Sequence, residues 1–196
     1  MTTIAALFVE TDGCYFNLPG VDPWDEPRDA RRYDGPYPVV AHPPCDRWHM
    51  LSAVNHKRWG FKINDDDGCF ASALAAVRMW GGVLEHPAQT RAFRFHGIPQ
   101  PTSRGWQRTI DGDWITEIDQ AAYGHRARKS TWLLYSGNNP PPALDWSRAF
   151  GTLQIGNFDK KLPVMSTAEA LATPPVFRDM LISIARIAAS ESRRAA

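Results

Sequence analysis

Apolar residues along the chain gather in short continuous runs between polar loops, a pattern typical of an α/β fold. The runs expected to form strands are Ile4–Val9, Tyr37–Ala41, Gly82–Leu84, Trp114–Ile118 and Thr131–Tyr135. Residues 10–36 are rich in Asp, Gly, Pro and Arg and are expected to be loop. We predict one α/β domain over residues 1–196, with a Rossmann-like, mostly parallel sheet.

Helices are expected where apolar positions recur at helical spacing. Asp65–Gly68 supplies acidic groups at a helix start, Cys69–Trp80 follows with that spacing, and Gly81-Gly82 ends the helix. A short helix is expected over Thr90–Phe95. The last helix begins after Thr173-Pro174-Pro175. Its expected apolar face is formed by Phe177, Met180, Leu181, Ile184 and Ile187.

Composition limits the class of protein. With 196 residues, 43% of them hydrophobic, the chain can bury a sizeable core, and a net charge of +1 neither demands nor excludes nucleic acid. Its three cysteines, Cys14, Cys45 and Cys69, show no repeated short spacing, so we expect a reducing, cytoplasmic compartment. We see no signal peptide and no apolar stretch long enough to cross a membrane.

Two short phrases point to chemistry: Pro43-Pro44-Cys45 after the second strand and Glu85-His86-Pro87 after the third. With the helix between them they form a strand–helix–strand unit, and open α/β sheets place reacting groups at the carboxyl ends of strands. A thiolate can add to carbon 6 of a pyrimidine if a carboxylic acid protonates ring nitrogen 3, which makes carbon 5 nucleophilic. The pair therefore predicts covalent chemistry on a pyrimidine.

Each of these residues also has a simpler interpretation. Cys45 could be a small buried residue in a proline turn, as we expect for Cys14 and Cys69. Glu85 could form an ion pair with a nearby arginine, because a carboxylate at the end of a buried strand needs a partner or a role.

A third feature is the basic segment 123–131, which precedes the Thr131–Tyr135 strand. In an extended segment Arg126 and Arg128 project to the same side, so both could reach one phosphate or one pyrimidine carbonyl. The alternative is a solvated basic loop. The six histidines show no metal-binding spacing, the acidic stretch 65–67 lacks the later positions of a calcium loop, and we expect no metal.

In this order, Pro43-Pro44-Cys45, Glu85-His86-Pro87 and Arg126-Ala127-Arg128 resemble the DNA (cytosine-5) methyltransferases, over roughly residues 37–136. That family carries a Pro-Cys nucleophile loop, a Glu-Asn-Val acid and a Gln-x-Arg-x-Arg segment. The resemblance implies that Cys45 is the nucleophile and Glu85 the acid, with Arg126 and Arg128 holding the base or backbone nearby. It also implies substrate contacts from Pro44, His86, His125 and Lys129.

The cofactor half departs from the family. S-adenosylmethionine is the cofactor implied, but the glycine-rich turn after the first strand is reduced to one glycine. About 34 residues separate Phe8 from Pro43, roughly the length of one strand–helix–strand unit. Cofactor contacts are then expected from Asp12, Gly13, Asp22 and Trp24, which could instead form ordinary turns. The family's large region that reads DNA sequence is missing.

We therefore expect modification, in the first place methylation, at carbon 5 of a pyrimidine in DNA or in a nucleotide. A reduced relative of this kind would suit a phage or mobile element. Two alternatives stay open. One is a non-catalytic nucleic-acid-binding protein using exposed aromatic and basic residues. Its candidate residues are Trp48, Trp59, Trp106, Arg104 and Arg108. The other is an enzyme with the same thiol addition but no S-adenosylmethionine.

Overall fold

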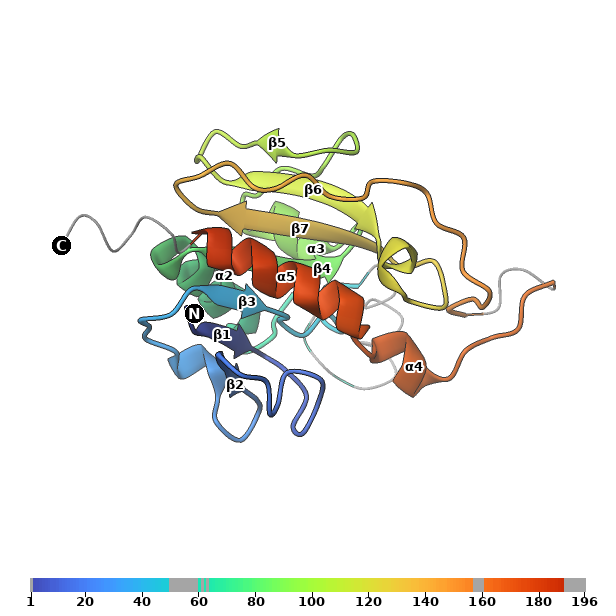
Figure 1. Ribbon diagram of the computed structural model, residues 1–196, viewed down its shortest axis with the longest axis horizontal. Helices are drawn as coiled ribbons and strands as arrows, with labels where there is room; N and C mark the ends of the chain where they lie inside the picture. The colour runs from blue at the N-terminus through green and yellow to red at the C-terminus, as the bar shows by residue number, and fades with distance from the viewer. Residues whose placement is uncertain (1, 50–59, 61, 63, 157–160, 189–196) are drawn as a thin grey trace.

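A seven-stranded mixed sheet organises the computed structural model, which describes residues 2–49, 60, 62, 64–156 and 161–188 (Figure 1). The strands lie side by side in the order β2 (Val21–Trp24), β1 (Ile4–Leu7), β3 (Val39–Ala41), β4 (Gly82–Pro87), β7 (Ser130–Ser136), β6 (Trp114–Asp119) and β5 (Gln107–Arg108). The α/β class is as predicted.

The sheet is not mostly parallel, which corrects the Rossmann-like expectation. Strands β2, β1, β3 and β4 pair in parallel, whereas β4–β7, β7–β6 and β6–β5 pair antiparallel. Only residues 120–129 join β6 to β7, and a parallel crossover needs a dozen or more residues, usually with a helix. The second half of the chain therefore folds back as hairpins beside a parallel half.

Helices cover both faces of the sheet (Figure 1). The helix α2 (Cys69–Trp80) packs Phe70, Leu74 and Val77 on one face, and its bounds match the prediction. The helix α5 (Pro175–Ala188) crosses the other face with Phe177, Leu181 and Ile184 buried. The short helix α3 (Arg91–Phe95) begins at Thr90, whose hydroxyl accepts a hydrogen bond from the Ala92 amide.

The start of α2 shows how the acidic stretch before it acts. The Asp66 carboxylate accepts hydrogen bonds from the Phe70 amide and from the Trp48 indole, both at 2.8 Å. One of the free amides of the first helical turn is thereby satisfied. The hydrogen bond from Trp48 to Asp66 connects the loop after β3, which carries Cys45, to the start of the helix.

Five short elements of the described structure were not expected from the sequence: β2, the 3-10 turns η1 (Ala30–Arg32) and η2 (Gln120–Tyr123), β5 and the helix α4 (Thr167–Leu171). The strand β2 lies at the edge of the sheet and contains Pro23. In the sequence this proline indicates a turn, but an edge strand tolerates proline. The strand β4 runs three residues longer than expected, so Glu85 and His86 lie within it. Of the helices described, none is long and apolar enough to span a membrane.

Candidate active site

Two of the four predicted catalytic residues, Cys45 and Glu85, come together at one edge of the sheet, where β1, β3 and β4 end and β7 begins (Figure 1). Cys45 lies in the turn that follows β3, and Glu85 lies in the neighbouring strand β4. Cys45 and Glu85 are close enough for the carboxylate to raise the pKa of the thiol. The strand–helix–strand unit thus brings the two groups together.

Strand register decides which side chains join Glu85. Glu85 is paired with Leu133, and because side chains alternate between faces, Thr131 and Lys129 share its face. Gln120, in the 3-10 turn η2 (Gln120–Tyr123), spans the gap: its amide donates to Glu85 Oε1 at 3.2 Å and to Thr131 Oγ1 at 2.8 Å. Gln120 and Thr131 were not predicted as site residues.

The Glu85 side chain is only 12% exposed and stays ionised. Burial alone raises its pKa, but the hydrogen bond from His42, the His42 charge and the Lys129 ammonium outweigh burial, so the pKa lies below the ordinary value. His42 Nδ1 lies 3.0 Å from Glu85 Oε2. The partner of Glu85 is therefore a histidine and a glutamine, not the arginine that the simpler interpretation required.

His42 extends the network to the loop after β1. Its Nε2 lies 2.8 Å from the hydroxyl of Tyr15, a residue that is 2% exposed. Burial raises the pKa of Tyr15 well above its ordinary value, so the phenol keeps its proton. Sequence reasoning missed both residues. His42 directly follows the β3 strand and could have been found by that position, whereas nothing in the sequence marks Tyr15.

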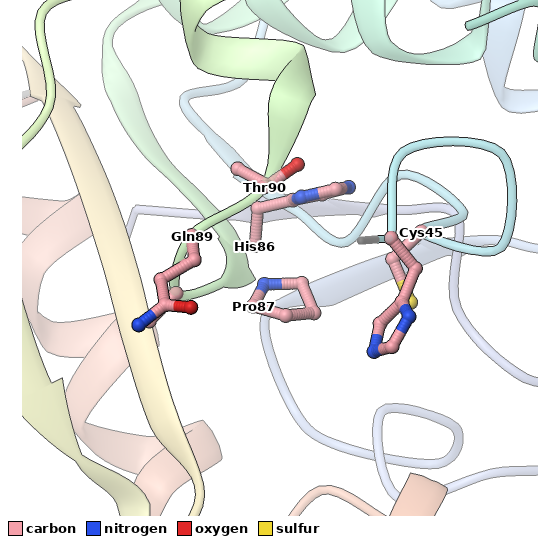
Figure 2. A pocket seen from close by; sticks show the side chains of 7 residues that line it. Cys45, His86, Pro87, Gln89 and Thr90 are labelled. Carbon is pink, nitrogen blue, oxygen red and sulfur yellow. The ribbon is translucent and has the colours of Figure 1, made fainter. Parts of the chain in front are cut away.

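The Cys45 thiol lies beside a cavity of about 140 Å³. Its lining residues are Cys45, His49, His86, Pro87, Ala88, Gln89 and Thr90. Figure 2 shows Cys45 on one side of this cavity and His86, Pro87, Gln89 and Thr90 on the other. Burial and the charges of Glu85 and Asp46 raise the pKa of the thiol, and the Lys129 ammonium lowers it only in part. The resting group is a protonated thiol.

His86 lines the same cavity from β4 and is fully buried. Its ring lies edge-on to Phe70 and against the backbone of Pro44, yet neither ring nitrogen meets hydrogen-bond geometry with any group that the structure describes. Burial lowers the pKa of His86 to about 4, so the ring is neutral. A neutral imidazole beside the thiol offers one donor and one acceptor to a bound molecule.

The basic segment divides between the two faces of β7. Lys129 faces Cys45 and Glu85, and its ammonium donates to the Ala170 carbonyl of α4 at 3.0 Å. Arg128 instead pairs with the fully buried Asp119 at 3.4 Å, and the exposed Arg126 pairs with Glu169 at 2.8 Å. The structure therefore brings Lys129, and not the two arginines, to the nucleophile; substrate binding by Arg126 and Arg128 stays a prediction.

His125 is held by its own loop. The ring is buried, and its Nδ1 lies 2.7 Å from the Ala127 carbonyl oxygen. Pro44 is exposed at the turn that carries Cys45. These placements leave Pro44, His86 and Lys129 next to the thiol, with His125 packed against its own backbone.

Two of the residues expected to bind S-adenosylmethionine, Asp22 and Trp24, contact each other and Arg28. The Asp22 carboxylate accepts from Arg28 Nη1 at 2.5 Å and from the Trp24 indole at 2.9 Å. The Arg28 guanidinium covers the Trp24 ring at 3.9 Å. Arg28 thus occupies both the carboxylate and the aromatic face that ribose and adenine would need, so these residues do not fit the cofactor in this arrangement.

The turn after β1 is likewise closed on itself. Gly13 donates its amide to the Glu10 carbonyl at 2.9 Å, and a side chain at Gly13 would collide with that carbonyl. The exposed Asp12 lies in this turn with a left-handed φ of 57°. Between β1 and β3, the point where the strand order reverses, Tyr15 and His42 bond to each other. S-adenosylmethionine stays a prediction.

The residues proposed for a nucleic-acid-binding protein are largely engaged. Trp48 is 1% exposed, which contradicts its expected role in stacking, and Trp106 packs against Tyr135 and donates to the Pro142 carbonyl. Arg104 pairs with Asp119 at 2.8 Å. Arg108 is exposed above the Trp114 ring, and Trp59 lies outside the described residues. Among the described residues, no group of three or more His, Cys, Asp or Glu could hold a metal.

Comparison with known proteins finds no match to this chain among protein-family models, curated proteins or solved structures. The function must therefore be argued from the chemistry of the site.

Proposed function

We propose that this protein activates carbon 5 of a pyrimidine, in DNA or in a nucleotide, through addition of the Cys45 thiolate to ring carbon 6. The observation that carries the proposal is the joint placement of Cys45, Glu85 and Lys129 at the ends of adjacent strands. The Lys129 ammonium lowers the pKa of both other groups, so all three belong to one electrostatic unit.

Each group has a defined task in this reaction. The Cys45 sulfur forms the bond to carbon 6, and the electrons of the carbon 5–carbon 6 double bond move toward the ring carbonyl and nitrogen 3. The proton that the Cys45 thiol loses is taken up by the ionised Glu85 and donated to nitrogen 3, which neutralises this charge. Lys129 stabilises the thiolate and the developing negative charge near it. Carbon 5 then attacks an electrophile or takes a proton from solvent.

The cavity beside Cys45 has the size of a single ring, and Glu85 and Lys129 are not among its lining residues. Its volume of about 140 Å³ is close to the roughly 150 Å³ that hold a benzene-sized ring in an engineered cavity. Its walls combine apolar surface from Pro87 and Ala88 with the polar groups of His86 and Thr90. A base in duplex DNA would have to leave the stack to reach this depth, whereas a single-stranded base or free nucleotide would not.

The electrophile defines two versions of this function. The sequence predicts a methyl group from S-adenosylmethionine. A specific observation favours the second version, an enzyme with the same thiol addition and another electrophile: Arg28 is bound to Asp22 and covers Trp24 where the adenosyl group would lie.

The test should detect thiol addition whatever the electrophile, because addition to carbon 6 makes the hydrogen at carbon 5 exchange with water. We would measure tritium release from 5-tritiated cytosine and uracil, each presented in duplex DNA, in single-stranded DNA and as a free nucleotide. We expect release with wild type and none above background with Cys45→Ala. Cys14→Ala and Cys69→Ala are matched controls, since Cys69 lies at the start of α2, away from the cavity lining.

Each outcome has a consequence. Release that persists in Cys45→Ala, or no release from any substrate, overturns the proposal. Release that depends on Cys45 identifies the substrate. Adding S-adenosylmethionine then separates the two versions, because only methyl transfer converts the labelled base into its 5-methyl product.

A further inference from the structure

The loop that follows β7 presents an aromatic side chain and an arginine to solvent. Phe150 is 83% exposed, and Arg148, two residues before it, is also exposed. The loop is fixed on both sides of these residues. The Trp146 indole donates a hydrogen bond to β6 at 2.9 Å, and the Leu153 amide donates to the Arg126 carbonyl at 3.0 Å. The exposed ring therefore belongs to an anchored stretch of chain.

The backbone of this loop lies directly against the basic segment 123–131 (Figure 1). Ala127 and Leu153 form a parallel bridge. Gly151 packs so closely on Arg126 and Ala127 that a side chain at this position would collide with their backbone. Phe150 directly precedes this contact, so its backbone is held beside the arginines of the segment.

The two arginines of the segment remain open to an anion. The Arg126 side chain is 62% exposed and lies 2.8 Å from Glu169, which is 44% exposed. An ion pair this exposed contributes little, because water solvates both charges. The Arg128 side chain is 47% exposed and lies 3.4 Å from Asp119, which Arg104 contacts more closely at 2.8 Å. A phosphate can therefore replace Glu169 and approach both guanidinium groups.

Arginines beside an exposed aromatic ring match the chemistry of single-stranded DNA. Guanidinium groups bind phosphates through paired hydrogen bonds, and an aromatic ring stacks on the flat face of any base. In a duplex the bases are already stacked on one another, so Phe150 would have no free face to contact. Further along the same segment, Lys129 faces Cys45 and Glu85. A strand bound along the segment would therefore pass beside the candidate active site.

We propose that an arginine-rich surface beside this segment binds single-stranded DNA and directs one of its bases to Cys45. The surface consists of Arg126, Arg128, Arg148 and Phe150. Delivery of the base to Cys45 rests on the proposed function, whereas binding of the strand does not. The substrate is then a base within a single strand and not a free nucleotide. Glu169 holds Arg126 in the free protein and gives way to a phosphate when the strand binds.

The test measures binding of the strand without any chemistry. We would titrate the protein into a fluorescein-labelled DNA strand of about 12 nucleotides and record fluorescence anisotropy. The same strand in duplex form and free cytidine monophosphate serve as comparison ligands. We expect the single strand to bind at least about tenfold more tightly than the duplex, because only its bases are free to stack. No binding of the strand, or equal binding of the duplex, overturns the proposal.

Two variants separate stacking from phosphate contact. Phe150→Ala should weaken strand binding about tenfold with an unchanged salt dependence, because stacking releases no counterions. Arg126→Ala should weaken binding and reduce the slope of log K against log salt by about 0.7, the value for one phosphate contact. Phe95→Ala on α3 and Arg108→Ala on the edge strand β5 are matched controls and should bind as wild type does. Unchanged binding in either Phe150→Ala or Arg126→Ala overturns the proposal.

Glu169→Gln distinguishes phosphate binding by Arg126 from a merely structural role. If a phosphate and Glu169 compete for Arg126, removing the carboxylate should strengthen strand binding about threefold. If Arg126 only fastens α4 to the segment, the same change should weaken binding or leave it unaltered, and either result overturns the proposal.

The outcomes keep this proposal separable from the proposed function. Strand binding with the expected variant effects, but without tritium release from any substrate, supports the surface and removes the thiol addition. Tritium release from a free nucleotide without strand binding keeps the thiol addition and overturns the surface. Binding to vesicles of anionic lipid that is lost in Phe150→Ala, in place of strand binding, would identify a membrane-binding surface and likewise overturn the proposal.

Discussion

Two regions of the sheet edge, one at β3 and β4 and the other at β2, carry polar and aromatic residues of similar kinds. Their side chains differ in whether neighbouring side chains already bind them. At β3 and β4, Cys45 and His86 face a cavity, and neither ring nitrogen of His86 meets good hydrogen-bond geometry with a residue described. At β2, the carboxylate of Asp22 and the ring of Trp24 are both taken up by Arg28. Both regions lie at the carboxyl ends of parallel strands, where ligands of α/β proteins bind. In the part of the chain described, the first region keeps the ring nitrogens of His86 beside the cavity, whereas Asp22 and Trp24 in the second are engaged by Arg28.

The contrast shows that residue type and position do not by themselves make a site. Asp22 and Trp24 are suitable for ribose and adenine, but an arginine six residues further along the chain satisfies both. Cys45 and Glu85 are equally ordinary residues until Lys129 and His42 are placed beside them. What distinguishes the halves is whether the neighbouring side chains satisfy a group or leave it available.

The largest expected effect is that of removing the nucleophile. Cys45→Ala should reduce tritium release from carbon 5 at least about 10³-fold, as loss of a nucleophile does in other covalent enzymes. Cys69→Ala should leave the rate unchanged. Equal losses in both variants would mean that the two substitutions act by disturbing the fold. The region at β3 and β4 would then no longer be distinguished by a nucleophile.

The second effect concerns stability at the open half. His86 is neutral in the folded protein, with its pKa lowered from 6.5 to about 4, so the unfolded chain binds a proton more readily. The free energy of unfolding should therefore fall as pH drops from about 6.5 to 4, by about 3 kcal/mol. Urea unfolding at pH 7 and pH 4.5 checks this: in His86→Gln the difference should shrink by most of that amount. An equal pH dependence in His86→Gln would contradict it.

The fold was predictable where local signals agree, and the sheet topology was not. The helix Cys69–Trp80 matched in both bounds because Asp66, its apolar spacing and Gly81 all agree. The reversal of β6 and β7 depends on the short connection 120–129, which contains no turn motif that the sequence makes obvious. The edge strand β2 was hidden by Pro23.

The candidate site was partly predictable for the same reason. Cys45 and Glu85 follow from strand ends, but Lys129 and Gln120 face them only because β7 runs antiparallel to β4. A one-residue change in that register would turn Arg128 toward the nucleophile instead. Tyr15 reaches His42 across the sheet from 27 positions away, a contact that no local pattern encodes.

Removing the charge of Glu85 should have the third largest effect. It should slow tritium release and speed alkylation of Cys45. Glu85→Gln should slow release of tritium about 10²-fold, because the amide cannot pass a proton to nitrogen 3. The same change should lower the pKa of Cys45, because the carboxylate raises it, and iodoacetamide should then alkylate Cys45 faster at pH 8. Faster alkylation with slower exchange separates the two roles. Slower alkylation would show that Glu85 helps to form the thiolate rather than opposing it.

The smallest effect is expected in the closed half. Arg28→Ala removes an exposed ion pair and a cation–π contact, each of which contributes about 0.5–1 kcal/mol at most. Thermal unfolding should therefore show a small loss of stability, and tritium release without any added cofactor should match wild type. Trp24→Ala is the companion variant, because it removes the aromatic face but leaves Asp22 to pair with Arg28. If Arg28→Ala slows tritium release more than tenfold, the region at β2 takes part in the reaction at Cys45. Calorimetric binding of S-adenosylmethionine by Arg28→Ala, but not by wild type or Trp24→Ala, would show instead that Arg28 keeps this half closed. Both variants lose the cation–π contact, but only Arg28→Ala keeps the Trp24 ring and removes the guanidinium from both the ring and Asp22.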